Sequence, residues 1–302
     1  SCRLTIEEAY RALLSAACGL DTEANERDRT LERDYFARSI RRLDPNCYRE
    51  NPYYRNIEIP NLSFGTWQLK TETYEPYEAF ICNDLIVDKT FKEIPRLGFF
   101  EEEFQFPTVV EAGNEWMAIK PNEIETMQPA IDAVTGKVVT FGLGLGYFAY
   151  MASEKDQVQN ITIVEKDHQA IGMFQKHILP QFRYKEKVRI VAMDAFEYVQ
   201  KRMSSESPDC AFVDLWHDVS DGFDMYLQMK KLEWLSPNTR FLYWIEDSLL
   251  STLRWRVFDQ MRQESEAQSR LRTYDQVSAL LEPDSLRKLA CSANSIAYTH
   301  PH

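Results

Sequence analysis

The fold is decided by one stretch, Val138-Val139-Thr140-Phe141-Gly142-Leu143-Gly144-Leu145-Gly146-Tyr147. Its first four residues are typical of a short buried strand, and a helical pattern begins at Tyr147. Three of the ten glycines of the chain fall within the five positions between them. Glycine permits a tight turn and a close approach of the backbone to a ligand, and a helix starting there turns its N–H groups toward that ligand. The stretch therefore predicts a strand, a ligand-binding loop and a helix, in preference to an ordinary glycine-rich connection.

Strands and helices alternate from this stretch onward. Four further apolar strands are predicted at 161–164, 188–191, 210–213 and 241–245. Amphipathic helices are predicted at 147–152, 168–179, 195–203 and 225–234. This alternation indicates a parallel sheet covered on both faces, and right-handed crossovers make such a sheet doubly wound. The tail is expected to be helical at 249–263, 276–281 and 285–289, with one weak strand at 295–299. We therefore predict an α/β domain over residues 131–302.

Residues 1–130 follow a different pattern. A helix is predicted from Ile6, with Thr5 as its cap and Gly19 as its stop, and the first 45 residues are expected to be helical. Dense mixed charge over 21–42 is typical of a solvated helix face. Prolines then separate runs rich in β-formers at 57–59, 63–69, 79–87 and 108–110, and a short helix is predicted at 123–132. We predict a helical and irregular α+β domain that serves as a substrate cover or in oligomerisation, for instance in a homodimer.

Composition narrows the classes of function. The 302 residues carry 35 Lys+Arg against 47 Asp+Glu, a formal net charge of −12. This balance argues against nucleic acid and against an anionic membrane surface as partners. The longest charge-free apolar stretch, 138–153, is too short to span a membrane and contains three glycines. The six cysteines form no CxxC pair, which is typical of reduced thiols and predicts neither disulfides nor a metal site. We expect a cytoplasmic protein.

The spacing of the glycines indicates which ligand the loop takes. A dinucleotide fingerprint needs G-x-G-x-x-G/A, but Tyr147 stands at its last small position. The pattern G-x-G-x-G after a first strand resembles that of class I, Rossmann-like methyltransferases, including the spermidine-synthase-like branch of that superfamily. The resemblance covers about residues 137–247. It implies a Rossmann-like sheet and S-adenosylmethionine as cofactor, held over Gly142, Gly144 and Gly146.

Two further positions match the cofactor-binding residues of that family. Glu165 ends the second predicted strand, and the resemblance implies that its carboxylate accepts hydrogen bonds from the ribose hydroxyls of the cofactor. Alternatively, Glu165 caps the next helix or is merely solvated. Asp167 is the better candidate for that cap, which leaves Glu165 for the ligand. Asp194 and Ala195 end the third strand, where the family positions the adenine. Alternatively, Asp194 forms a capping box with Glu197, and both roles are compatible.

The fourth strand ends in Phe212-Val213-Asp214-Leu215-Trp216-His217-Asp218. This is the carboxyl end of a central strand, beside the point where ligands bind in open α/β sheets. The resemblance places Asp214 near the reacting end of the cofactor, where it serves both binding and catalysis. Trp216, His217 and Asp218 would line the substrate side, with His217 or Asp218 as orienting group or general base.

Three functions remain open at this point. We expect methyl transfer to a small-molecule or protein acceptor. The alternative is spermidine-synthase-like aminopropyl transfer, which the acidic balance suits, but those enzymes carry a carboxylate inside the glycine loop where this chain has Leu145. The third is a non-catalytic, cofactor-binding scaffold. The tetrad Asn51-Pro52-Tyr53-Tyr54 resembles one used by methyltransferases of amino groups, but it precedes the glycine loop, and we interpret it as a turn with packed tyrosines.

Overall fold

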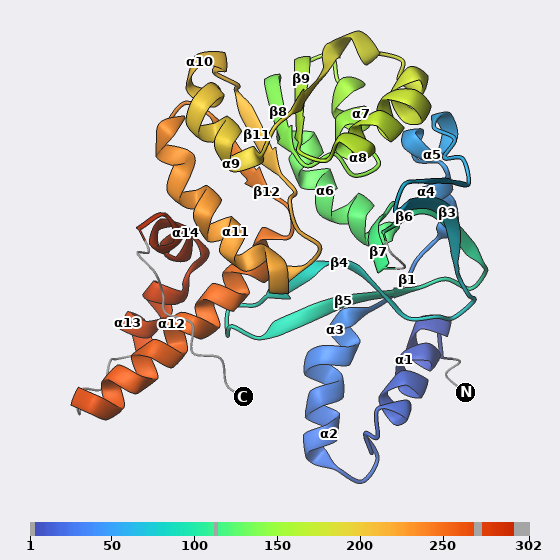
Figure 1. Cartoon of the computed structure of the whole chain (residues 1–302). Coiled ribbons are helices and arrows are strands. Elements are labelled where there is room, and N and C mark those ends of the chain that lie inside the picture. Colours follow the sequence, from blue (N-terminus) through green and yellow to red (C-terminus); the bar gives the residue numbers. More distant parts are fainter. Residues whose placement is uncertain (1–3, 112–113, 269–273, 293–302) are drawn as a thin grey trace. The chain divides into compact units, whose positions relative to one another are not determined.

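A computed structural model describes residues 4–111, 114–268 and 274–292 of the chain (Figure 1). The contacts of the backbone divide these residues into two compact units. The first comprises the residues up to Asp132 together with Gly144–Met151 and Gly172–Lys185. The second comprises Ala133–Leu143, Ala152–Ile171 and the residues from Glu186 onward. The glycine loop is therefore shared, because its first two residues belong to the second unit and its remainder to the first.

The first unit begins with helices, as predicted. Helix α1 (Ile6–Ala17) starts at a capping box in which Thr5 and Glu8 bind each other's backbone N–H, and Gly19 follows its end with a φ of +81°. After it come α2 (Glu26–Leu31), a π-helical turn (Glu32–Phe36) and α3 (Ala37–Ser39). The expectation of helix up to residue 45 was wrong at its end. Residues Ile40–Arg42 form strand β1, which pairs in parallel with β5 and so satisfies its backbone groups there.

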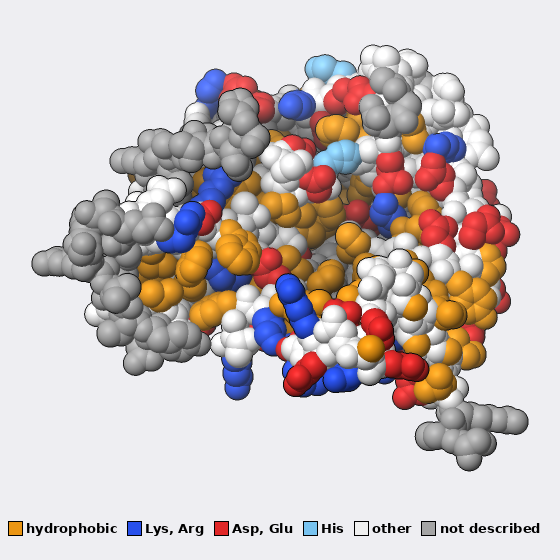
Figure 2. Space-filling view, turned by 90° about the horizontal axis from the view of Figure 1, so that it is seen from below, with side chains coloured by type: hydrophobic (Ala, Val, Ile, Leu, Met, Phe, Trp, Pro, Cys, Tyr) orange, Lys and Arg blue, Asp and Glu red, His pale blue; other side chains and the backbone are white. Residues whose placement is uncertain are grey.

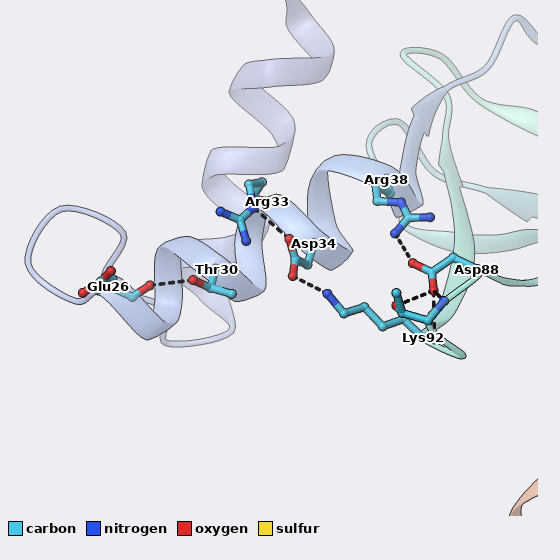
Figure 3. A network of polar contacts seen from close by, with 8 residues as sticks. Glu26, Thr30, Arg33, Asp34, Arg38, Asp88 and Lys92 are labelled. Atoms are coloured by element: carbon cyan, nitrogen blue, oxygen red, sulfur yellow. Dashed lines mark hydrogen bonds and ion pairs between the residues drawn. The ribbon is translucent and has the colours of Figure 1, made fainter. Parts of the chain in front are cut away.

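The charged segment of the first unit makes ion pairs with a neighbouring hairpin (Figure 3). Arg38 Nη1 lies 2.7 Å from Asp88, and Lys92 Nζ lies 2.5 Å from Asp34, which also pairs with Arg33. These contacts tie the π-helical turn and α3 to the connection between β4 and β5. Figure 2 shows acidic and basic side chains interspersed on one face. The mixed charge of this segment is thus partly used in ion pairs within the unit.

Two sheets complete the first unit (Figure 1). One has the order β1-β5-β4, with β4 (Phe80–Val87) antiparallel to β5 (Glu93–Phe99). The other is antiparallel in the order β2-β3-β6-β7, and its strands are Leu62–Phe64, Trp67–Tyr74, Phe104–Glu111 and Asn114–Ala118. The single run predicted at 63–69 is in fact a hairpin, because Gly65 turns the chain with a φ of +62°. The run of β-formers at 57–59 forms no strand, since these residues have no ladder partner.

Three helices of the first unit flank these sheets in sequence. They are α4 (Pro45–Arg49), α5 (Pro52–Asn56) and α6 (Pro121–Ala133). Asn51 caps α5 by accepting a hydrogen bond from Tyr53 N, and Tyr53 is buried. Tyr54 is held through a hydrogen bond of its hydroxyl to Ile119 O. The expectation of packed tyrosines in the 51–54 tetrad is therefore confirmed, but the expected turn is wrong, because Asn51 is the N-cap of α5 and residues 52–54 are its first residues.

The second unit is built on the predicted parallel sheet. Its five strands lie in the order β10-β9-β8-β11-β12 and are Val188–Ala192, Val158–Glu165, Gly136–Phe141, Cys210–Val213 and Arg240–Tyr243. The chain runs outward from β8 to one edge and then crosses to the other side of β8, which makes the sheet doubly wound. The fold is thus mixed α/β, with a five-stranded parallel sheet, N-terminal mixed and antiparallel sheets and C-terminal helices, as predicted.

The helices between the strands agree with the prediction in place and differ at their ends. Strand β8 is followed by α7 (Tyr147–Ser153). Strand β9 is followed by α8 (His168–Met173), a π turn (Phe174–Ile178) and two 3-10 turns (Leu179–Gln181, Lys185–Lys187). Strand β10 is followed by α9 (Ala195–Tyr198), a π turn (Val199–Met203) and α10 (Ser204–Glu206). After β11, α11 (Val219–Leu232) begins six residues before the predicted Met225, because Asp218 and Asp221 form a capping box there; a 3-10 turn (Glu233–Leu235) follows.

The tail of the second unit is helical. It consists of α12 (Glu246–Gln268), α13 (Tyr274–Leu281) and α14 (Pro283–Ser292), and an ion pair between Glu246 and Arg287 joins the first and last of these. Strand β12 ends at Tyr243, two residues earlier than predicted, because Ile245 adopts a φ of +47° in a turn. The weak strand predicted at 295–299 lies outside the described residues.

Each unit has its own apolar core. In the second unit, α9 packs Tyr198 edge-on against Phe141 of β8, and α11 packs Tyr226 against Tyr243 of β12. The core of the first unit is aromatic, with Phe99, Phe100 and Phe104 fully buried. Within the described residues, no helix combines the length and the apolar character needed to cross a membrane.

Candidate functional site

The switch point of the parallel sheet lies between β8 and β11, whose carboxyl ends are neighbours. Phe141 is paired in register with Val213, and Asp214 N donates a 2.9 Å hydrogen bond to Phe141 O. The chain then turns at Gly142 with a φ of +99°, and a Cβ built there would overlap the carbonyl oxygen of Asp214. The prediction of a tight turn is therefore confirmed. The two backbones that follow β8 and β11 approach each other more closely than any side chain on Gly142 would allow.

The other two loop glycines make room for protein side chains. Gly144 and Gly146 have φ values of +50° and +76°. A Cβ at Gly144 would overlap the thioether of Met117, and a Cβ at Gly146 would overlap the ring of Phe174. Internal packing thus accounts for the absence of side chains at both positions. A ligand role for this loop has to be argued from the groups around it.

Glu165 reaches the glycine loop from the end of β9. One carboxylate oxygen accepts a hydrogen bond from Leu143 N at 3.2 Å, and the other accepts from Asp167 N at 2.8 Å. Asp167 itself caps α8 by accepting from Gln169 N and Ala170 N, as the sequence predicts. Glu165 therefore supports the loop backbone. A carboxylate offers about four acceptor positions, so two of them remain for a ligand.

Asp194 and Ala195 begin α9 beyond the end of β10. Met193 N donates to Glu165 O at 3.0 Å, which sets the following Asp194 beside the end of β9. Asp194 accepts a 3.0 Å hydrogen bond from Glu197 N, so it caps the helix. The capping box suggested by the sequence is only half formed, because the Glu197 side chain pairs with Lys201 instead. Ala195, the first residue of α9, is buried.

Asp214 carries the most unusual titration in the site. Its side chain is half-buried, and burial alone raises the pKa of its carboxyl to about 7. Among the described residues, no cation or hydrogen-bond donor offsets that burial. Desolvation disfavours the charged form, so the pKa rises when nothing compensates. Strongly shifted carboxyls at a strand end are typical of functional sites, because folding alone gains nothing from them.

Trp216 adds a second polar group without a partner. It is 5% exposed, and its indole Nε1 is buried with no hydrogen-bond acceptor in the described part of the chain. The ring stacks on Tyr243 and lies so close to Gly222 that a Cβ there would overlap it. Buried donors are almost always satisfied in native proteins, so this donor can bind a hydrogen-bond partner such as a water molecule or a ligand. The family resemblance places Trp216 on the substrate side, but no sequence pattern predicts that its indole N–H lacks a partner.

His217 and Asp218 lie at the start of α11. Asp218 is the N-cap of α11 and accepts a hydrogen bond from Ser220 N at 2.6 Å. Hydrogen bonds with the side chain and the backbone of Ser220 lower the pKa of its carboxyl. His217 is exposed, and its backbone N donates to the carboxylate of Asp221. The structure therefore gives Asp218 a capping role, and the catalytic assignment of Asp214, His217 and Asp218 stays a prediction.

Met117 is the residue of this region that sequence reasoning missed. It belongs to β7, far from the glycine loop in sequence. No local pattern distinguishes a methionine that contacts a distant loop from one in an ordinary core. Within the described residues, no group of three or more His, Cys, Asp or Glu side chains is placed to hold a metal ion.

Comparison with known proteins gives limited likenesses. No protein-family model matches the chain, and no curated protein matches it. It is similar to a solved structure of a conserved hypothetical protein from Streptococcus pyogenes, with a TM-score of 0.29 and 16% identity over 35% of this chain and 62% of that one. It is also similar to spermidine synthase from Thermotoga maritima, with a TM-score of 0.34 and 16% identity over 46% of this chain and 53% of that one. The chain thus spans less than two thirds of either structure, and its activity has to be argued from the site.

Proposed function

We propose that this chain is an S-adenosylmethionine-dependent transferase, and that it transfers a methyl group. The observation that carries the proposal is the half-buried, unpartnered carboxyl of Asp214 at the switch point, beside the turn at Gly142. In open α/β sheets this is where ligands bind. A cationic ligand would supply the compensation that the carboxyl lacks.

The surrounding groups fit an adenosyl ligand. Glu165 has acceptor positions left for ribose hydroxyls, and it lies beside the loop that it supports. Asp194 and Ala195 stand one strand further along, where an adenine edge can meet a carboxylate and a backbone N–H. These roles follow from the family resemblance, and each rests on a residue that the fold brings to the carboxyl edge of the sheet.

Each residue then has a defined task. When bound, the cofactor supplies a carbon made electrophilic by an adjacent sulfonium. The Asp214 carboxyl ionises beside that positive charge and holds it in place. We assign Trp216, whose Nε1 has no acceptor in the described part of the chain, to the substrate side, and we assign the exposed His217 the role of general base. Such a site acts mainly by aligning two reactants.

The glycine loop favours methyl over aminopropyl transfer. Leu145 is fully buried at the position where aminopropyl-transferring enzymes carry a carboxylate. The loop therefore offers no carboxylate to hold an amine. Product analysis separates the functions: decarboxylated cofactor with putrescine tests aminopropyl transfer, and a panel of small-molecule and protein acceptors tests methyl transfer. Binding without turnover of either kind would favour a scaffold.

Titration calorimetry tests the binding step. We expect S-adenosylmethionine to bind with a micromolar Kd, and Glu165→Gln to weaken that binding at least about tenfold by removing charge from the ribose contact. Asp167→Asn is the matched control, because it neutralises the neighbouring carboxylate while Asn still caps a helix well. If neither S-adenosylmethionine nor S-adenosylhomocysteine binds the folded wild-type chain, the proposal is refuted.

A further inference from the structure

The Met117 side chain occupies the glycine loop of its own chain. Its sulfur lies 3.0 Å from Leu145 N and accepts a hydrogen bond from it. The same thioether takes the space that a side chain on Gly144 would need. Met117 is thus both the hydrogen-bond partner and the steric occupant of the middle of this loop.

The hydrogen bond to Met117 is a weak one. A thioether sulfur is a poor acceptor compared with a carboxylate or hydroxyl oxygen. The other loop groups are well held, since Tyr53 Oη donates to Leu145 O at 2.6 Å and Tyr150 N donates to Gly146 O at 2.8 Å. The loop is therefore fixed in shape, with one N–H whose partner is easily exchanged for a better acceptor.

The hairpin that carries Met117 is shaped to present it. In the β6–β7 ladder, Val109 pairs with Met117 but Val110 pairs with Glu115, so Trp116 is an extra residue. Such bulges turn neighbouring side chains and are frequent beside functional sites. Thr108 Oγ1 donates a 3.0 Å hydrogen bond to Met117 O and fixes the backbone there. Only the long, flexible side chain of Met117 is then left to move.

We propose that Met117 is a displaceable internal occupant of the glycine loop, and that a ligand with an oxygen acceptor must replace its sulfur at Leu145 N. This inference rests on the proposed function, because it concerns the same loop. When Met117 occupies the loop in most molecules, the apparent affinity for the ligand equals the intrinsic affinity multiplied by the fraction of molecules in which the loop is open. Met117 therefore sets the apparent affinity of the loop without touching the bound ligand.

Hydrogen exchange of the ligand-free chain tests the occupancy alone. Amides 143–146 should exchange about fivefold faster in Met117→Ala, because Leu145 N loses its partner and becomes open to water. Met117→Leu keeps the volume but lacks the acceptor and should give an intermediate rate. Met225→Ala on α11 is the matched control and should leave these amides unchanged. Equal rates in the wild type and both Met117 variants, all shown to be folded by their melting curves, would overturn the inference.

Titration with S-adenosylmethionine tests the displacement. We expect Met117→Ala to bind about fivefold more tightly than the wild type, and Met225→Ala to bind equally. If the wild type binds but Met117→Ala binds no more tightly, the inference is wrong and the proposed function stands. If neither binds while exchange is faster in Met117→Ala, the occupancy is supported but the proposed function and the displacement by this ligand are both refuted.

Discussion

Replacing Asp214 by Asn should stabilise the protein, and more so as the pH rises. The pKa of the Asp214 carboxyl is about 7 in the folded chain, against an ordinary value of 3.8. The folded state therefore holds a proton that the unfolded state has released between about pH 4 and pH 7. Stability falls across that window as the pH rises, by about 1.4 kcal/mol per pH unit. Above pH 7 the full cost is present, about 4 kcal/mol as an upper bound.

The assay is urea unfolding of the wild type and Asp214→Asn at about pH 4.5, 6 and 8, followed by tryptophan fluorescence. The amide cannot ionise, so the variant avoids the cost, and its advantage should grow from about 1 kcal/mol at pH 4.5 to about 4 kcal/mol at pH 8, the latter as an upper bound. Groups that titrate alike in both proteins contribute nothing to the difference between their free energies of unfolding. Asp218→Asn is the control: this carboxyl has a lowered pKa as a helix cap, and Asn caps nearly as well. An Asp214→Asn variant no more stable at pH 8 than the wild type would refute the reasoning.

Three further predictions follow from local geometry. Gly142→Ala should lower the free energy of unfolding in urea by at least about 3 kcal/mol, because φ is +99° there and the new Cβ would overlap the Asp214 carbonyl. Gly19→Ala is the control and should cost only about 1 kcal/mol, because φ is +81° but the space around it is open. Equal costs in the two variants would contradict this prediction. Thr5→Ala should lower stability by about 1 kcal/mol through loss of the α1 capping box, and an unchanged melting temperature would argue against it. Binding of S-adenosylmethionine should release a proton near pH 6.5 and should strengthen up to about tenfold per pH unit toward pH 7, levelling off above it, because a cation lowers the pKa of Asp214. Calorimetry in buffers of different ionisation enthalpy measures that proton, and its persistence in Asp214→Asn would exclude Asp214 as its source.

The second unit shows how much of a fold a sequence pattern can specify. The short apolar runs at β8, β9, β10 and β11 alternate with amphipathic helices, and a chain with that alternation has few ways to bury its apolar faces other than a parallel sheet. Chain order and the handedness of crossovers then bring the ends of these strands together. Short-range patterns in the sequence therefore specify the sheet, the turn at Gly142 and the position of Glu165, Asp194 and Asp214 at one edge.

The surroundings of those carboxylates depend on the packing of distant segments. Asp218 is a helix cap and Asp214 is a desolvated acid, because different N–H groups and apolar atoms surround the two carboxyls. The spacing of residues along the chain does not specify these surroundings. The contact between Met117 and Leu145 joins residues of different elements and depends on a bulge that no local pattern predicts. Periodicity fixes which elements form because it acts between neighbours in sequence, whereas burial and contact arise only once distant segments are packed together.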